Sequence, residues 1–223
     1  MNSNRFAHGS ESLIYIIHAC MYPQRAVPNK HQQRSEATRR KLISSARRIF
    51  ARDGFQAARI EDIAADAGHT RGAFYANFES KETLFLALLE QQVSEHIERL
   101  MQRLECCEWD REKLAALREY YLERAADRQW CMLLLEFKLF AVRHPRIRAK
   151  LARAHRKIRS SLKEQMGRLL PRISTRGTED ATRASLEATL HGLVLQHAYD
   201  PEILSGEQLK EILGHIFDAL AAG

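Results

Sequence analysis

Apolar residues recur at helical spacing along most of this chain, and no alternating strand pattern of useful length appears. Residues 60–67 are typical, since their apolar side chains stand at i, i+3, i+4 and i+7 and share one helix face; these are Ile60, Ile63, Ala64 and Ala67. Such patterns predict about nine helices, over residues 36–52, 60–67, 71–78, 80–104, 110–127, 128–143, 145–170, 178–199 and 207–221. The predicted fold class is all-α.

A tight turn separates two of the shortest predicted helices. Gly68 ends the first, and Thr70 can cap the second by accepting a hydrogen bond from its free amides. The second helix begins at about Arg71, and its inward face is small, with Phe74 and Phe78 at i and i+4. Its polar side chains point outward. This pattern predicts a helix-turn-helix, which lays the start of its second helix against the base edges of DNA.

Five short motifs extend this pattern in order: Gly54-Phe55, Ile63-Ala64, Ala67-Gly68, Tyr75-Ala76-Asn77-Phe78 and Ser80-Lys81-Glu82. Through them, the segment from about Glu36 to Glu90 resembles the DNA-binding domain of the tetracycline-repressor (TetR) family. The resemblance implies an N-terminal three-helix DNA-binding domain over residues 36–96, with its turn-helix unit at about 59–78. It also implies a C-terminal helical domain for effector binding and dimerisation over residues 97–223. Residues 1–35 are expected to form a disordered arm.

The residues predicted to contact DNA are Arg59, Thr70, Arg71, Gly72, Ala73, Tyr75, Asn77 and Lys81. Arg71 is the predicted base reader, because a guanidinium matches guanine O6 and N7 in a bidentate way. Gly72 and Ala73 are small enough to let the helix approach DNA closely. Phosphate contacts are predicted for Tyr75, Asn77 and Lys81. Partial core packing remains an alternative for Tyr75.

Two positions depart from the family pattern. Ala58-Arg59 stands where a Thr or Ser usually caps the helix and touches phosphate, so Arg59 is expected to supply that contact. Glu61 and Asp62 offset the missing cap through the helix dipole. Thr83 replaces the Glu of a capping box after Ser80.

Dimerisation is implied because one short recognition helix reads only a few base pairs. The last two predicted helices carry apolar stripes of the kind that two chains combine into a four-helix bundle. The predicted interface comprises Leu186, Leu190, Leu193, Val194, His197, Leu209, Ile212, Leu213, Ile216 and Phe217. An intrachain core is the alternative.

A small-molecule effector, often an apolar one, is also implied by the resemblance. The residues predicted to line its pocket are Trp130, Leu134, Phe137, Phe140, Met166 and Leu195. The same residues fit an ordinary core equally well. No other cofactor is expected.

The net charge of +7 is concentrated in one segment, Arg143 to Arg172, which holds 11 Lys or Arg and one acid, so its charge is 11 minus 1, or +10. We interpret this predicted helix as a solvated face. Attraction of an anionic effector is one alternative. The other is weak steering toward DNA, which fades within a Debye length of about 8 Å at physiological salt.

Metal and catalytic motifs are absent from the sequence. The four cysteines, Cys20, Cys106, Cys107 and Cys131, include no CxxC pair, and no HExxH, GxSxG, P-loop or GxGxxG occurs. No metal site and no enzyme activity is therefore predicted. A thiol-sensing role for Cys106 and Cys107 remains a minor alternative.

The apolar stretch from Leu13 to Met21 is not interpreted as a signal peptide, because His18 interrupts it and no clean cleavage site follows. Met21 as the true start is one hypothesis. No run of about 20 apolar residues exists, so no membrane partner is expected. The protein is expected to be cytoplasmic.

The sequence thus predicts a transcriptional repressor that binds a palindromic double-stranded DNA operator as a homodimer and is released by a small-molecule effector. One alternative is an activator or an effector-blind regulator. The alternative from another class is a helical enzyme or small-molecule-binding protein whose turn-helix is vestigial.

Overall fold

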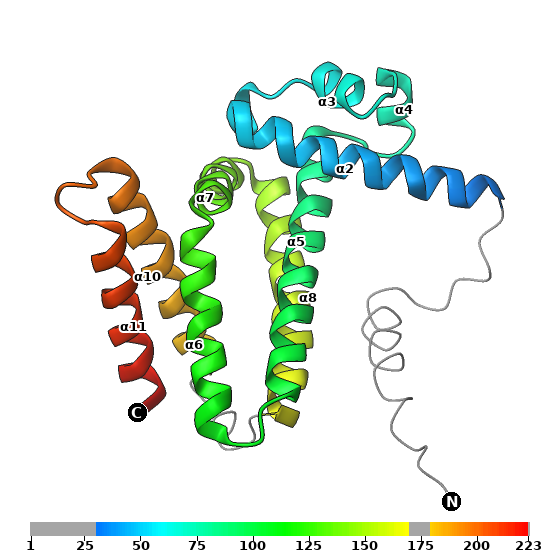
Figure 1. The fold of residues 1–223 in the computed structure, drawn as a ribbon. Coiled ribbons are helices and arrows are strands. Elements are labelled where there is room, and N and C mark those ends of the chain that lie inside the picture. The colour runs from blue at the N-terminus through cyan, green and yellow to red at the C-terminus, as the bar shows by residue number, and fades with distance from the viewer. Residues whose placement is uncertain (1–29, 170–178, 223) are drawn as a thin grey trace, which may run out of the picture. The chain divides into compact units, whose positions relative to one another are not determined.

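The computed structural model describes residues 30–169 and 179–222 (Figure 1). The chain divides into two compact units, Met1–Arg40 and Lys41–Gly223, and the described part of the first, residues 30–40, is helical. Most of the expected N-terminal arm and the alternative start at Met21 lie outside the described residues.

The described residues form nine α-helices and no strand, as the apolar pattern predicted. They are α2 (Lys30–Ala57), α3 (Ile60–Asp66), α4 (Arg71–Tyr75), α5 (Lys81–Glu105), α6 (Asp110–Ala126), α7 (Arg128–Arg143), α8 (Pro145–Leu169), α10 (Glu179–Tyr199) and α11 (Gly206–Ala222). Within residues 30–169 and 179–222, none of them combines the length and apolar character needed to cross a membrane.

Helix α2 differs from its predicted limits at both ends. It begins at Lys30, six residues before the predicted start at Glu36, because the intervening residues include no Gly or Pro to stop it. Near its other end, Gly54 has φ 77° and ψ 168°, so the helix is broken there and its last residues form a separate turn. Only glycine adopts this backbone region without strain.

The core of the helix-turn-helix region extends into α7. The predicted apolar face of α2 is buried, with Leu42 and Ala46 at 0% exposure. The ring of Phe55 lies 4.9 Å from that of Phe137 on α7, and Phe137 stacks on Phe85 of α5 at 4.0 Å between centroids. One continuous cluster therefore crosses the predicted domain boundary at residues 96 and 97.

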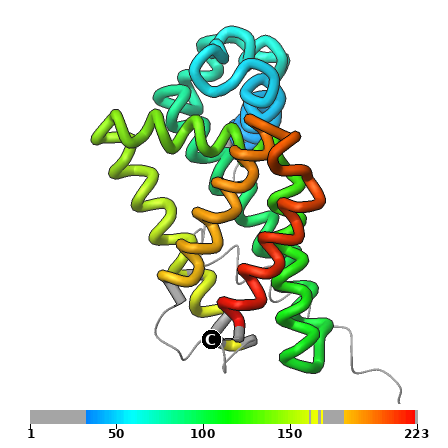
Figure 2. The backbone as a smooth tube through the Cα atoms, turned by 90° about the vertical axis from the view of Figure 1, so that its left-hand side faces the viewer, coloured from blue at the N-terminus to red at the C-terminus, as the bar shows by residue number. Residues whose placement is uncertain are grey.

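A second core joins α6, α10 and α11, which lie side by side in the second unit (Figures 1 and 2). Six predicted interface residues lie inside it, each no more than 5% exposed: Leu186, Leu190, Val194, Leu209, Leu213 and Phe217. They pack around Tyr121 and Ala125 of the same chain. These six residues fit the alternative of an intrachain core, because α6 already covers the apolar stripes within one chain, and their role in a dimer interface remains a prediction.

The other four predicted interface residues are less buried. Leu193 and Ile216 are half-buried against the same core, and Ile212 is 38% exposed. His197 Nδ1 lies 2.8 Å from the carbonyl oxygen of Leu204, so this ring holds the loop between α10 and α11.

Candidate nucleic-acid interface

Helices α3 and α4 meet through the predicted glycine turn. Gly68 has φ 72°, and the backbone N–H of His69 donates to the Ala64 carbonyl at 2.8 Å, which closes α3. The Thr70 hydroxyl then accepts a hydrogen bond from Ala73 N at 3.3 Å and caps α4. Both predictions are confirmed.

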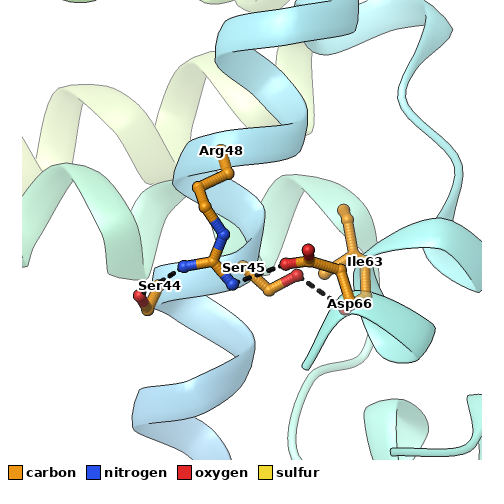
Figure 3. A network of polar contacts seen from close by, with 5 residues as sticks. All are labelled: Ser44, Ser45, Arg48, Ile63 and Asp66. Carbon is orange, nitrogen blue, oxygen red and sulfur yellow. Dashed lines mark hydrogen bonds and ion pairs between the residues drawn. The ribbon is translucent and has the colours of Figure 1, made fainter. Parts of the chain in front are cut away.

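Three polar side chains fix α3 against α2 (Figure 3). The buried Ser45 hydroxyl donates to the Ile63 carbonyl at 2.7 Å. The Arg48 guanidinium donates to Ser44 Oγ at 3.0 Å and to Asp66 Oδ2 at 2.6 Å. Arg48 thus bridges two helices, whereas the sequence only indicated that it faces solvent or phosphate.

Two buried rings anchor α4 and leave its other faces open. Phe74 and Phe78 are 0% and 2% exposed, as predicted, while Thr70, Arg71 and Gly72 are exposed. Tyr75 is 45% exposed, which argues against the core-packing alternative for its ring. The start of α4 is therefore free to approach a partner.

Ala73 and Asn77 are less exposed than Thr70, Arg71 and Gly72. Both are half-buried, and Asn77 Nδ2 donates to the Ala73 carbonyl at 2.8 Å. The amide of Asn77 thus stabilises the end of α4, and its phosphate contact remains a prediction.

Arg71 lies between Glu61 and Tyr75. Its Nη1 is 3.0 Å from Glu61 Oε1, and its guanidinium lies 5.5 Å from the centre of the Tyr75 ring. Tyr75 through a hydrogen bond, and then Glu61 through its charge, raise the pKa of Arg71. Glu61 and Tyr75 therefore hold the side chain of Arg71, the predicted base reader, in place while it remains 63% exposed.

Glu61 also faces Arg59, whose Nε lies 3.9 Å from Glu61 Oε2. As predicted, no side chain caps α3, and Glu61 stands with Asp62 in its first turn. The sequence suggested only a dipole effect for Glu61 and missed its contact with both arginines. The contact with Arg59 could have been expected from the sequence, because Glu61 follows Arg59 by two residues. The contact with Arg71 could not, because it depends on how the turn places α4 beside α3.

Lys81 has a structural role that the sequence did not reveal. Its Nζ donates to the carbonyls of Gln56 at 2.8 Å and Ala58 at 2.9 Å, and it lies 5.0 Å from the centre of the Phe55 ring. Burial lowers the pKa of this amine. Lys81 therefore ties the start of α5 to the end of α2, and its phosphate contact remains a prediction.

The predicted effector-pocket residues are not gathered around one space. Trp130, Leu134 and Phe137 are buried in the first core, and Phe140 packs against it. Leu195 is 47% exposed on α10, and the Met166 side chain lies outside the described part of the structure. The alternative of an ordinary core fits the first four, and pocket lining remains a prediction.

The basic segment is solvated, as interpreted from the sequence. Every Lys and Arg from Arg143 to Arg168 is exposed, and Arg172 lies outside the described residues. Lys150 Nζ lies 3.7 Å from Glu79 Oε2, and Arg168 pairs with Glu164.

The remaining chemistry is sparse. Among the described residues no group of three or more His, Cys, Asp or Glu is placed to hold a metal ion. Cys106 is exposed and Cys107 half-buried, both as free thiols. Burial raises the pKa of the Cys131 thiol to about 11, so this group is protonated at neutral pH.

Two short helices joined by a tight glycine turn, with the start of the second helix exposed, place this protein in the class of helix-turn-helix proteins. The family described as "Bacterial regulatory proteins, tetR family" matches residues 42–88, and "BetI-type transcriptional repressor, C-terminal" matches residues 110–222. The second match covers half of the chain. This chain belongs to the TetR family.

Individual relatives agree. The Transposon Tn10 TetC protein of Escherichia coli is 38% identical over 65 residues, which cover 29% of this chain and 33% of that protein. The HTH-type transcriptional regulator UidR of E. coli K12 is 26% identical over 200 residues, covering 84% of this chain and 97% of UidR. The fold resembles that of Bacillus subtilis FadR, solved in complex with stearoyl-CoA, with a TM-score of 0.59, 19% identity, and coverage of 82% and 98%.

Proposed function

We propose that this protein is a transcriptional repressor that binds a palindromic DNA operator as a homodimer and is released by a small-molecule effector. The observation that carries the proposal is the exposed start of α4, where Thr70, Arg71 and Gly72 face outward above two buried rings. In this role Arg71 reads a base, while Arg59 and Tyr75 hold phosphates on either side.

The same face is set up electrostatically for an anionic partner. Arg59 and Arg71 are 72% and 63% exposed, and they share one carboxylate, that of Glu61. Two cations and one anion leave a positive edge at the start of α4. DNA phosphates replace the weak surface pairing with Glu61, because exposed ion pairs contribute only about 0–1 kcal/mol.

The homodimer is proposed on the exposed face of α10 and α11, of which only Ile212 belonged to the interface predicted from the sequence. One side of α10 is exposed and uncharged, and it carries Ala184, Ser185, Ala188, Gly192, Leu195 and Tyr199. Ile212 and Leu220 on α11 are 38% and 37% exposed. Small residues let two helices approach closely, so two copies of α10 and α11 fit a four-helix bundle.

Release by an effector needs a mechanical link between α7 and the DNA-binding helices. Such a link exists in Gln129, whose Nε2 donates to the Ala51 carbonyl at 3.0 Å, and in Glu136, whose carboxylate accepts from Phe55 N at 2.9 Å. A ligand that favours another position of α7 shifts the equilibrium by its differential affinity for the two states. The stearoyl-CoA complex of FadR supports an effector role for this domain.

The proposal is tested by footprinting DNA upstream of the protein's own coding region, with a salt titration and competitor DNA. We expect protection of two symmetric half-sites with centres separated by about one helical turn or a multiple of it. Binding that is weak, lost at moderate salt and without symmetric protection would contradict the operator-binding dimer. Increased transcription on binding would favour the activator alternative, and protein that no metabolite extract releases would favour the effector-blind one.

A further inference from the structure

A polar stripe runs along the buried side of α10. Arg183, Glu187 and His191 follow one another at i, i+4 and i+8, so they share one face of the helix. His191 is only 5% exposed. Among the described residues, its Nε2 and the Nη1 of Arg183 are buried without any hydrogen-bond partner. Buried polar atoms without a partner are uncommon in native proteins and call for an explanation.

Cations from two other helices face this stripe. Arg124 on α6 lies 3.8 Å from Glu187 and has a side chain that is only 16% exposed. The half-buried Lys138 on α7 is close enough for Glu187 to raise its pKa and for Arg124 to lower it, while burial lowers it most. Burial also lowers the pKa of His155 on α8, which Lys138 lowers further. Four helices thus contribute to one cluster.

The charges of this cluster do not balance. Arg124, Lys138 and Arg183 supply three positive charges against the single carboxylate of Glu187, which leaves +2. Burial lowers the pKa of His191 to about 4, so this ring is neutral at pH 7. The charge of Asp127 also raises the pKa of the nearby Cys131 thiol, but the Asp127 carboxylate accepts a hydrogen bond from Trp130 N and caps α7. If Asp127 is counted with the cluster, the net charge is +1. Buried charge without a counterion is costly, so a bound anion would compensate it.

We propose that α6, α7, α8 and α10 enclose a binding site for a small organic anion, whose carboxylate or phosphate group lies against Arg183, Lys138 and Arg124. The free Nε2 of His191 meets a second polar group of the same ligand. This inference rests on the proposed function, because it gives the effector its chemical class. It also moves the effector site away from the rings of Trp130 and Phe137, which already pack on the DNA-binding helices.

The test uses the full-length protein without DNA, at constant ionic strength, with matched probe pairs that differ only in charge: acetate and acetamide, benzoate and benzamide, octanoate and octanamide. We expect at least one acid to raise the melting temperature by at least about 2 °C more than its amide. Lys138→Met and Arg183→Met should abolish that difference. Lys163→Met removes the same charge from an exposed position on α8 and should retain it.

Equal effects of every acid and its amide, or a full response in Lys138→Met, would overturn the proposed site. A second measurement needs no ligand. Because Lys138 is a half-buried cation in a cluster with more positive than negative charge, Lys138→Met should melt at or above the temperature of Lys163→Met. A clearly lower melting temperature would mean that Lys138 belongs to a satisfied structural network.

The two proposals can fail separately. Operator binding without any probe tests the repressor, and the charge preference of the thermal shift tests the anion site. Release of DNA by a neutral compound that still stabilises Lys138→Met would overturn the anion site and leave the repressor intact. An anion that binds through Lys138 without releasing DNA would support the anion site and contradict the proposal that a ligand at this site releases the repressor.

Discussion

The carboxylate of Glu136 on α7 accepts a hydrogen bond of 2.9 Å from the backbone N–H of Phe55, where α2 breaks. Its other oxygen accepts from Gln56 N at 2.8 Å. Gly54 makes the approach possible, because a Cβ at this residue would lie 2.9 Å from Glu136 Oε2. One side chain of the C-terminal helices therefore holds the backbone of the DNA-binding region.

Replacing Glu136 by alanine should destabilise the fold. The substitution leaves the amides of Phe55 and Gln56 without their acceptor, and an unsatisfied amide costs about 1–3 kcal/mol in buried settings. Since Gln56 is exposed and can turn to water, we expect a loss near the lower end of that range. Urea unfolding measures it. Glu136→Gln keeps one acceptor and should lose less; equal losses for both variants would contradict the two-amide contact.

Glu61→Gln should strengthen operator binding. The substitution removes the partner that Arg71 holds at 3.0 Å and a negative charge beside the expected phosphates. Because the exposed pair is weak, we expect a gain of up to about five-fold in affinity, largest at low salt. Fluorescence anisotropy on operator DNA measures this gain. Glu207→Gln, an exposed change on α11, should leave affinity unaltered. Weaker binding by Glu61→Gln would instead show that Glu61 orients Arg71 for contact.

Ala188→Arg should convert a dimer into a monomer. Ala188 is exposed in the centre of the uncharged face of α10, so an arginine there places two cations together across a two-fold interface. Sedimentation equilibrium measures the assembly state. Ala115→Arg, the same change at an exposed alanine of α6, should remain dimeric. A dimeric Ala188→Arg protein would place the interface on another face.

Stability should fall in weak acid, partly because of His191. Burial lowers its pKa to about 4, helped by the charges of Lys138 and Arg124. The unfolded chain binds this proton near pH 6.5, so the contribution of His191 is complete above about pH 6.5 and is lost as pH falls toward 4. The loss from this residue is at most about 3 kcal/mol.

Urea unfolding at about pH 7 and about pH 5 measures this loss. His191→Leu should lose less stability than the wild type over that interval. A residual loss is expected, since burial also lowers the pKa of His96 and of His155. Identical losses in variant and wild type would contradict the assigned role of His191.

Local patterns in the sequence were enough to predict the helix-turn-helix. Gly68, Thr70 and Phe74 act within a few residues of one another, so spacing alone indicated the turn, the cap and the anchor. Contacts between distant segments were not predicted. Nothing near Glu136 indicates that its carboxylate meets Phe55, and Lys81 seemed available for phosphate until its carbonyl partners were known.

The dimer interface shows the same limit. Leu190 and Leu213 lie on apolar stripes, but a stripe does not reveal whether its partner helix comes from the same chain or another. In the structure α6 covers both residues. The exposed face of α10 carries small residues such as Ala188 and Gly192, which do not stand out in a pattern of large apolar side chains. The spacing of Arg183, Glu187 and His191 was visible in the sequence but had no meaning until Arg124 and Lys138 were placed beside it.

Operator affinity of Arg71→Ala is the most direct test of the central claim that the start of α4 reads DNA sequence. Fluorescence anisotropy would compare the footprinted fragment with a scrambled one, using wild type, Arg71→Ala and Lys163→Met. Because a bidentate base contact contributes about 1–3 kcal/mol of discrimination, we expect Arg71→Ala to lose at least about five-fold in operator affinity. Its affinity for the scrambled fragment should change far less, and Lys163→Met should match the wild type. Equal operator affinity of Arg71→Ala and Lys163→Met would contradict the account.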